Sequence, residues 1–91
     1  MKYEELVDLA CKHFEITKAN FDNSKKKQGV INARMSIANE LHNDGYANEE
    51  IAVMMCTTKE TISRYLLSFD DRVRYDYDFK SSYFEFKKEI R

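Results

Sequence analysis

The feature of this sequence that most limits its fold is the near absence of residues that interrupt helices. The 91 residues include no proline, and the glycines are only two, Gly29 and Gly45. Because these two residue types are the least compatible with a helix interior, long uninterrupted helices are allowed almost everywhere. A chain of this length builds one core. The sequence therefore predicts an all-α fold, a small helical bundle.

Apolar spacing places the first helices. Residues 3–14 carry apolar side chains at steps of three and four, and Thr17 is placed to cap one further turn through Phe21. The next helix, from about Val30 to Asn43, has two adjoining apolar stripes. Such a wide apolar arc is typical of a central helix with neighbours on both sides.

Turn and capping residues place the helices that follow. Gly29 ends the basic loop that precedes the central helix, and Gly45 supplies the left-handed conformation that ends that helix. Asn48 is the expected N-cap of a short helix. Thr57 and Glu60 are expected to form a capping box at the start of another, which runs to residue 69.

The C-terminal segment, residues 70–91, has two interpretations. Residues 72–80 alternate between apolar and charged side chains, which is typical of a strand. The alternative is a helix with its inner face formed by Tyr75, Phe79, Ser82, Phe86 and Ile90. Residues 81–91 are expected to be helical in either case. We therefore expect a domain of residues 1–69 and an aromatic-rich extension of residues 70–91 for dimerisation or partner binding.

Composition and charge exclude several classes of protein. The chain has 43% hydrophobic residues and a formal net charge of −1, which fits a folded domain and not a disordered one. No window of about eighteen apolar residues is present, so we expect no membrane span. The acidic N-terminal segment does not resemble a signal peptide. We therefore expect a cytoplasmic protein with Cys11 and Cys56 reduced.

No residue pattern indicates catalysis. His13 and His42 are solitary and have no serine, cysteine or aspartate partner at a useful spacing. The adjacent Glu49 and Glu50 are explained by the helix dipole, which favours acids in a first turn. The sequence has no glycine-rich phosphate loop and no cluster of metal ligands. We expect a protein that is not an enzyme and binds no metal or cofactor.

Residues 48–69 follow the pattern of a helix-turn-helix. Ala52 is small where the two helices would cross closely, and Cys56 occupies the turn position, where a small residue is usual. Ile62 falls ten residues after Ala52 and turns the apolar face of the second helix inward. Such a motif leaves one surface of the second helix open to the DNA major groove. The pattern predicts DNA binding, although the same fold also serves protein–protein contact.

The predicted DNA contacts come from two segments. The exposed positions at the start of the second helix are Thr58, Lys59, Glu60, Ser63 and Arg64, and Thr61 is placed for a phosphate. Arginine or lysine can bind guanine O6 and N7, and glutamate can accept from cytosine N4. The other segment is a window without acids that contains Lys25, Lys26, Lys27 and Arg34. We expect it to be a phosphate clamp or a minor-groove arm.

Four pieces of the sequence occur together in the order LVDLACKHFEITKANF, SKKK, VINARMSIANEL and GYANEEIAVMM. Through them residues 4–67 resemble the C-terminal DNA-binding domain of the bacterial replication initiator DnaA, in the Trp-repressor-like group. The resemblance implies a basic loop in the minor groove and a second helix that reads the major groove. It assigns these roles to Lys25, Lys26 and Lys27, and to Thr58, Lys59, Glu60 and Thr61. At that helix start the family has arginine-aspartate-histidine-threonine-threonine, whereas this chain has TTKET.

These features predict a sequence-preferring protein that binds double-stranded DNA. We expect a regulator of transcription or replication, of the kind encoded by a phage or mobile element. The alternative is a protein-interaction module, an initiator-domain mimic or a phage-type inhibitor or adaptor, which the near-neutral charge and the aromatic tail favour. We also expect a homodimer through residues 70–91, because two linked half-sites compensate for weak binding by each subunit.

Overall fold

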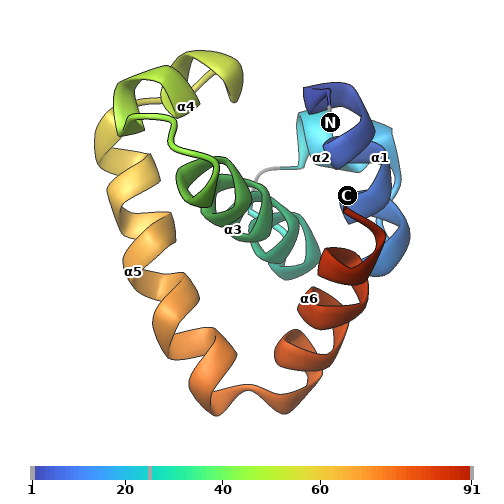
Figure 1. Ribbon diagram of the computed structural model, residues 1–91. Helices are drawn as coiled ribbons and strands as arrows, with labels where there is room; N and C mark the ends of the chain where they lie inside the picture. Colours follow the sequence, from blue (N-terminus) through green and yellow to red (C-terminus); the bar gives the residue numbers. More distant parts are fainter. Residues whose placement is uncertain (1, 25, 91) are drawn as a thin grey trace.

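The computed structural model describes residues 2–24 and 26–90, and every regular element within them is an α-helix. The helices are α1 (Tyr3–His13), α2 (Lys18–Asn23), α3 (Gln28–Asn43), α4 (Asn48–Met54), α5 (Lys59–Tyr75) and α6 (Tyr77–Glu89). Figure 1 shows α3 in the centre, with α4 and α5 on one side and α1, α2 and α6 on the other. The predicted all-α class is confirmed.

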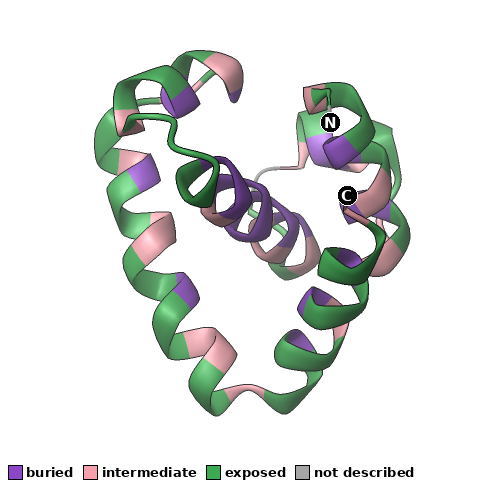
Figure 2. Cartoon of the chain, viewed as in Figure 1, coloured by how far each residue is buried: buried purple, intermediate pink, exposed green. Residues whose placement is uncertain are grey.

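The central helix α3 is buried along most of its length, as its two apolar stripes predict. Its residues 33–38 are all buried, and Figure 2 shows buried positions running along it and along the inward faces of α5 and α6. The helix begins at Gln28, so Gly29 lies in its first turn and does not end the preceding loop as predicted. A Cβ atom on Gly29 would lie 2.9 Å from Ile16 Cγ2, which explains the glycine by close packing.

Local hydrogen bonds decide where the shorter helices begin. Thr17 caps α2 as predicted, because its Oγ1 accepts from the backbone N–H of Asn20 at 3.0 Å. The N-cap of α4 is Ala47 and not Asn48. The Ala47 side chain has no acceptor, and the Glu50 carboxylate accepts from the backbone N–H of Ala47 at 2.8 Å. This bond pairs the N–H of the N-cap residue itself, whereas an N-cap side chain pairs the N–H of the second or third helical residue.

The cap of α5 is one residue later than the sequence predicts. Thr58 Oγ1 accepts from the backbone N–H of Thr61 at 3.2 Å, so Thr58 is the N-cap in place of Thr57. Gly45 has a φ of 99°, which confirms the predicted left-handed conformation after α3. The connection between α3 and α4 therefore follows the expected turn chemistry.

Residues 72–80 form no strand and are helical apart from a break at Asp76. Of the predicted inner face of the helix, Phe79 and Phe86 are buried, whereas Tyr75 is 78% exposed. Helix α5 continues to Tyr75, and Asp76 then caps α6, its Oδ1 accepting from the backbone N–H of Phe79 at 3.1 Å. A lone strand here would have no partner among the described residues. In the helical form α6 buries Phe79 and Phe86 in the core instead.

The C-terminal segment is part of the core of the molecule. Its aromatic side chains pack with Phe14 and Phe69, whose ring centroids lie 5.7 and 5.6 Å from that of Phe79. Tyr83 donates a hydrogen bond to the buried Glu40 of α3 at 2.6 Å and accepts one from Asn39 at 3.1 Å. The expected domain boundary between residues 69 and 70 falls inside α5.

A clasp at the surface also ties α6 to α1. Glu89 pairs with His13, and its carboxylate lies 3.3 Å from Lys12 Nζ. The hydrogen bond from His13, with that from Lys12, lowers the pKa of Glu89 below its ordinary value. Among the described helices, none is both long enough and apolar enough to cross a membrane.

Candidate nucleic-acid interface

Helices α4 and α5 meet at a tight turn with the features that the sequence predicts. Ala52 and Ile62 are both buried in the core. The turn closes through backbone hydrogen bonds from Cys56 to Val53 (3.2 Å) and from Thr57 to Ala52 (2.9 Å). Cys56 has a φ of 55°, a left-handed conformation that glycine adopts more easily. The turn therefore places a non-glycine residue in a backbone conformation that favours glycine.

The first turns of α5 are open to solvent on their outer side. Thr58, Lys59, Glu60, Ser63 and Arg64 are exposed, and Thr61 is half-buried. The aromatic C-terminal segment does not cover these positions, so their side chains are accessible to a partner molecule.

The exposed side chains differ in how far neighbouring residues hold them. Thr58 and Thr61 hydrogen-bond to each other at 3.1 Å, and Arg64 Nη2 donates to Thr61 Oγ1 at 3.3 Å. Ser63 Oγ accepts from Asn48 Nδ2 at 3.2 Å. Lys59 makes no hydrogen bond or ion pair with the residues that the structure describes. Of these two cations, Lys59 is held by no described residue, and Arg64 is held only by its hydrogen bond to Thr61.

The lysine segment lies close to this part of α5. Lys26 and Lys27 are exposed, and Lys27 is the N-cap of α3. Lys25 lies outside the described residues. An open groove of about 1040 Å³, here named the α3–α5 groove, is lined by residues of these two helices and of the segments beside them. Lys26 lines this groove together with Thr61 and Arg64.

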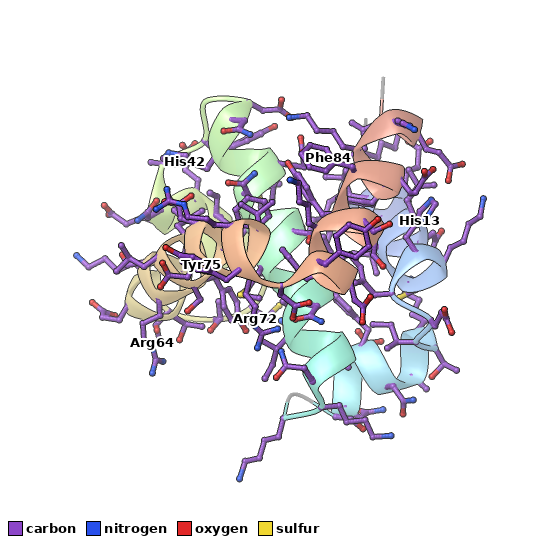
Figure 3. All side chains as sticks on the ribbon, turned by 90° about the horizontal axis from the view of Figure 1, so that it is seen from below. His13, His42, Arg64, Arg72, Tyr75 and Phe84 are labelled. Carbon is purple, nitrogen blue, oxygen red and sulfur yellow. The ribbon has the colours of Figure 1, made fainter. Side chains whose placement is uncertain are left out.

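Polar and charged side chains line much of the α3–α5 groove. The lining residues are Lys26, Gln28, Ile31, Met35, Thr61, Arg64, Tyr65, Ser68, Asp71, Arg72, Tyr75 and Asp76. Figure 3 shows Arg64 pointing outward from α5 and Arg72 lying between α5 and α3. Arg72 lies between the acids Asp71 and Asp76 in this lining, and its Nη1 is 3.8 Å from Asp76 Oδ2. Lys26 and Arg64 form no ion pair with the described residues, so an anionic ligand would be drawn to them.

Arg72 is a groove residue that was not predicted from the sequence, and it shares a hydrogen-bond acceptor with Gln28, at the end of the predicted lysine segment. Arg72 Nη1 donates to Asn32 Oδ1 at 2.8 Å, and Gln28 Nε2 donates to the same oxygen at 2.8 Å. The alternating pattern around residue 72 indicated a strand, and a strand would not place Arg72 on the same helix as Arg64. A helical reading places Arg72 eight residues after Arg64, on the same face of α5.

Arg34 does not belong to this interface, contrary to the prediction from its basic window. It is 5% exposed, and its Nη2 donates to the backbone carbonyl of Phe21 at 3.0 Å. Its guanidinium carbon lies 4.6 Å from the centroid of the Phe21 ring. Arg34 lies within the buried stretch 33–38 of the central helix, and its side chain contacts Phe21 of α2 and not solvent.

The predicted site residues are therefore only partly brought together. The structure brings Lys26, Thr61 and Arg64 to one groove and buries Arg34 elsewhere. The exposed residues that do not line the groove are Lys27, Thr58, Lys59, Glu60 and Ser63, and Lys25 lies outside the described residues. Within the described residues, no group of three or more histidine, cysteine, aspartate or glutamate side chains could hold a metal ion.

Comparisons with known proteins find no match, because no protein-family model, no curated protein and no solved structure matches the chain. The resemblance to the DnaA domain therefore stays a prediction. The residues and geometry described above are the basis for assigning a function.

Proposed function

We propose that the chain binds double-stranded DNA, with α4 and α5 acting as a helix-turn-helix, and regulates transcription or replication. The observation that carries the proposal is the α3–α5 groove, which Lys26 lines together with Thr61 and Arg64 from the first turns of α5. A duplex lying along this edge meets a base-reading helix and a phosphate-binding loop together.

The proposed contacts divide into specificity and affinity. Arg64 and Lys59 are directed to guanine edges in the major groove, and Glu60 to the amino group of cytosine. Lys26 and Lys27 bind phosphates, and Lys25 extends the same basic run in the sequence. Thr58, Thr61 and Ser63 already have protein partners, so their role is to hold the start of α5 and to assist with phosphates.

The test is selection of bound duplexes from a random pool, followed by affinity measurements on variants. Arg64→Ala is expected to weaken the selected site by about 5- to 150-fold and to relax one base position. Lys26→Ala with Lys27→Ala is expected to weaken selected and random duplexes alike. The matched control is Lys80→Ala with Lys88→Ala on α6, which should leave affinity unchanged. A pool that yields no binder near physiological salt would contradict the proposal.

A protein-interaction role, such as initiator mimicry or inhibition, is the second candidate. Val53 on α4 and Leu67 on α5 are 79% and 71% exposed, although both are large and apolar. Apolar surface on these two helices fits a protein partner better than a phosphate backbone. The test is capture of a protein partner from a nuclease-treated cell extract. Capture by the unchanged protein that is lost in the double variant Val53→Ser with Leu67→Ser would favour this role.

A homodimer through residues 70–91 remains part of the proposal. Three of the six aromatic side chains of this segment are buried within the protein itself, so the contact must use the exposed Tyr75, Tyr77 and Phe84. Light scattering is expected to give a dimer mass that Tyr75→Ser with Tyr77→Ser reduces to that of a monomer. A monomer for the unchanged protein at high concentration would remove the dimer.

A further inference from the structure

A separate cavity of about 400 Å³ lies among α1, α2, α3 and the end of α4. It shares no lining residue with the α3–α5 groove. Its apolar surface comes from Val7, Phe21, Met54 and Met55. A volume of this size accommodates a small organic molecule.

One wall of the cavity is formed by Arg34, a buried cation without an anionic partner. The side chain has one hydrogen bond, from Nη2 to the Phe21 carbonyl, and its buried Nε has none. No carboxylate of the described residues lies within 4.0 Å of the guanidinium. Because buried charges in proteins are normally paired, this arginine lacks the counter-ion that its position requires.

Two further donors border the same cavity. Burial raises the pKa of Tyr3, so its hydroxyl stays protonated and can donate a hydrogen bond. Lys18 lies at the rim together with the acids Glu4 and Asp22, and water screens the charges of all three because they are exposed. The buried part of the cavity therefore has Arg34 as its charged group and is otherwise mainly apolar.

We propose that this cavity binds a small organic carboxylate with a compact apolar body. The guanidinium of Arg34 pairs with the carboxylate, which matches its fork geometry and supplies the missing negative charge. The apolar body packs against Phe21, Met54 and Met55. A single buried cation and apolar walls suit a monoanion better than a phosphate, which carries more charge than one arginine neutralises.

The test is titration of the full chain, followed through its backbone amide NMR signals. The probes are phenylacetate and 4-methylpentanoate, and their neutral amides are the matched controls. Each acid is expected to give saturable shifts around residues 3, 21, 34 and 54–56, with a dissociation constant on the order of 1 mM. The amides are expected to give no saturable shift. Absence of saturation with both acids, or equal binding of the amides, would overturn the proposal.

Variants test whether the acids bind at the buried Arg34. Arg34→Met is expected to abolish saturation by the acids, with thermal unfolding used to check that the variant is folded. Should it not fold, Tyr3→Phe removes one donor and is expected to weaken binding about 2- to 10-fold. Tyr77→Phe, an exposed position outside the cavity, is the control and should bind as the unchanged protein does. If Arg34→Met is folded and binds the acids as well as the unchanged protein does, the ligand lies elsewhere. If Arg34→Met does not fold, undiminished binding by Tyr3→Phe leads to the same conclusion.

Discussion

Cys56 holds a backbone conformation that is costly for any residue with a side chain. Its φ of 55° lies in the left-handed region, and its side chain is exposed. The left-handed conformation costs a non-glycine residue about 1–2 kcal/mol. Since the thiol is not packed in the core, this cost is not offset by burial at the same position. The turn between α4 and α5 therefore stores strain at one residue.

Replacing Cys56 separates backbone strain from side-chain effects. Cys56→Gly is expected to be more stable than Cys56→Ala by about 1 kcal/mol, because only glycine relieves the strained φ. Chemical denaturation under reducing conditions measures the two free energies of unfolding. Equal stability of the glycine and alanine variants would show that the turn relaxes to another conformation.

At the scale of the element, α6 is a structural helix of the domain and not an appendage. It contributes Phe79, Tyr83 and Phe86 to the core, each at 3% exposure or less. Tyr83 joins α6 to α3 through Glu40, and Glu89 joins it to α1 through His13. Loss of this helix would uncover the apolar surfaces of α1 and α5 against which it packs, so we expect residues 1–69 alone not to fold.

Two neighbouring phenylalanines of α6 provide a matched test of this role. Phe86 is fully buried, whereas Phe84 is 44% exposed. Phe86→Ala is expected to lower the free energy of unfolding by about 3–5 kcal/mol, through lost burial and a residual cavity. Phe84→Ala should cost much less, on the order of 1 kcal/mol. Denaturant unfolding measures both, and similar costs for the two variants would contradict the placement of α6.

The link between α6 and α3 also predicts a dependence of stability on pH. Burial, with the hydrogen bond to Glu40, raises the pKa of Tyr83 above its ordinary value near 10. The folded state therefore retains a proton that the unfolded state releases. The resulting stability is fully present below about pH 10 and is lost as the pH rises above it.

Tyr83→Phe isolates this contribution. Above about pH 10 the unfolding free energy of the unchanged protein is expected to fall more steeply than that of Tyr83→Phe, by up to about 1.4 kcal/mol per pH unit. At neutral pH the variant should lose about 1–3 kcal/mol, because the buried Glu40 is left without its donor. Tyr77→Phe, at an exposed position, is the control, and parallel alkaline profiles for all three proteins would refute the assignment.

At the scale of the whole molecule, charge is distributed unevenly although the total is close to zero. The net charge of −1 includes exposed cations around the α3–α5 groove and acids at Asp71 and Asp76 toward the end of α5. Local potential, and not net charge, decides where an anionic polymer binds. The proposed interface therefore predicts a limited number of phosphate contacts.

The salt dependence of DNA binding counts those contacts. We expect about three to five cations to contact phosphates. A plot of the logarithm of the association constant against the logarithm of the salt concentration should then have a slope of about −3 to −5. Lys26→Ala should reduce the magnitude of this slope by about one. Titrations at several salt concentrations measure it, with Lys80→Ala on α6 as the control. An unchanged slope in Lys26→Ala would exclude this lysine from the interface.

By itself the sequence determined the helical elements, because helix formation depends on local spacing and local caps. The absence of proline, the cap at Thr17, the left-handed turn at Gly45 and the small residue at Ala52 all predict features that the structure contains. Only the tertiary structure decided that Arg34 is buried, and that Lys26, Arg64 and Arg72 line one groove. These outcomes depend on contacts between residues far apart in the chain, which a local pattern does not encode. The alternation in residues 72–80 favoured a strand for the same reason, since the core that makes α6 helical is assembled from α1, α3 and α5.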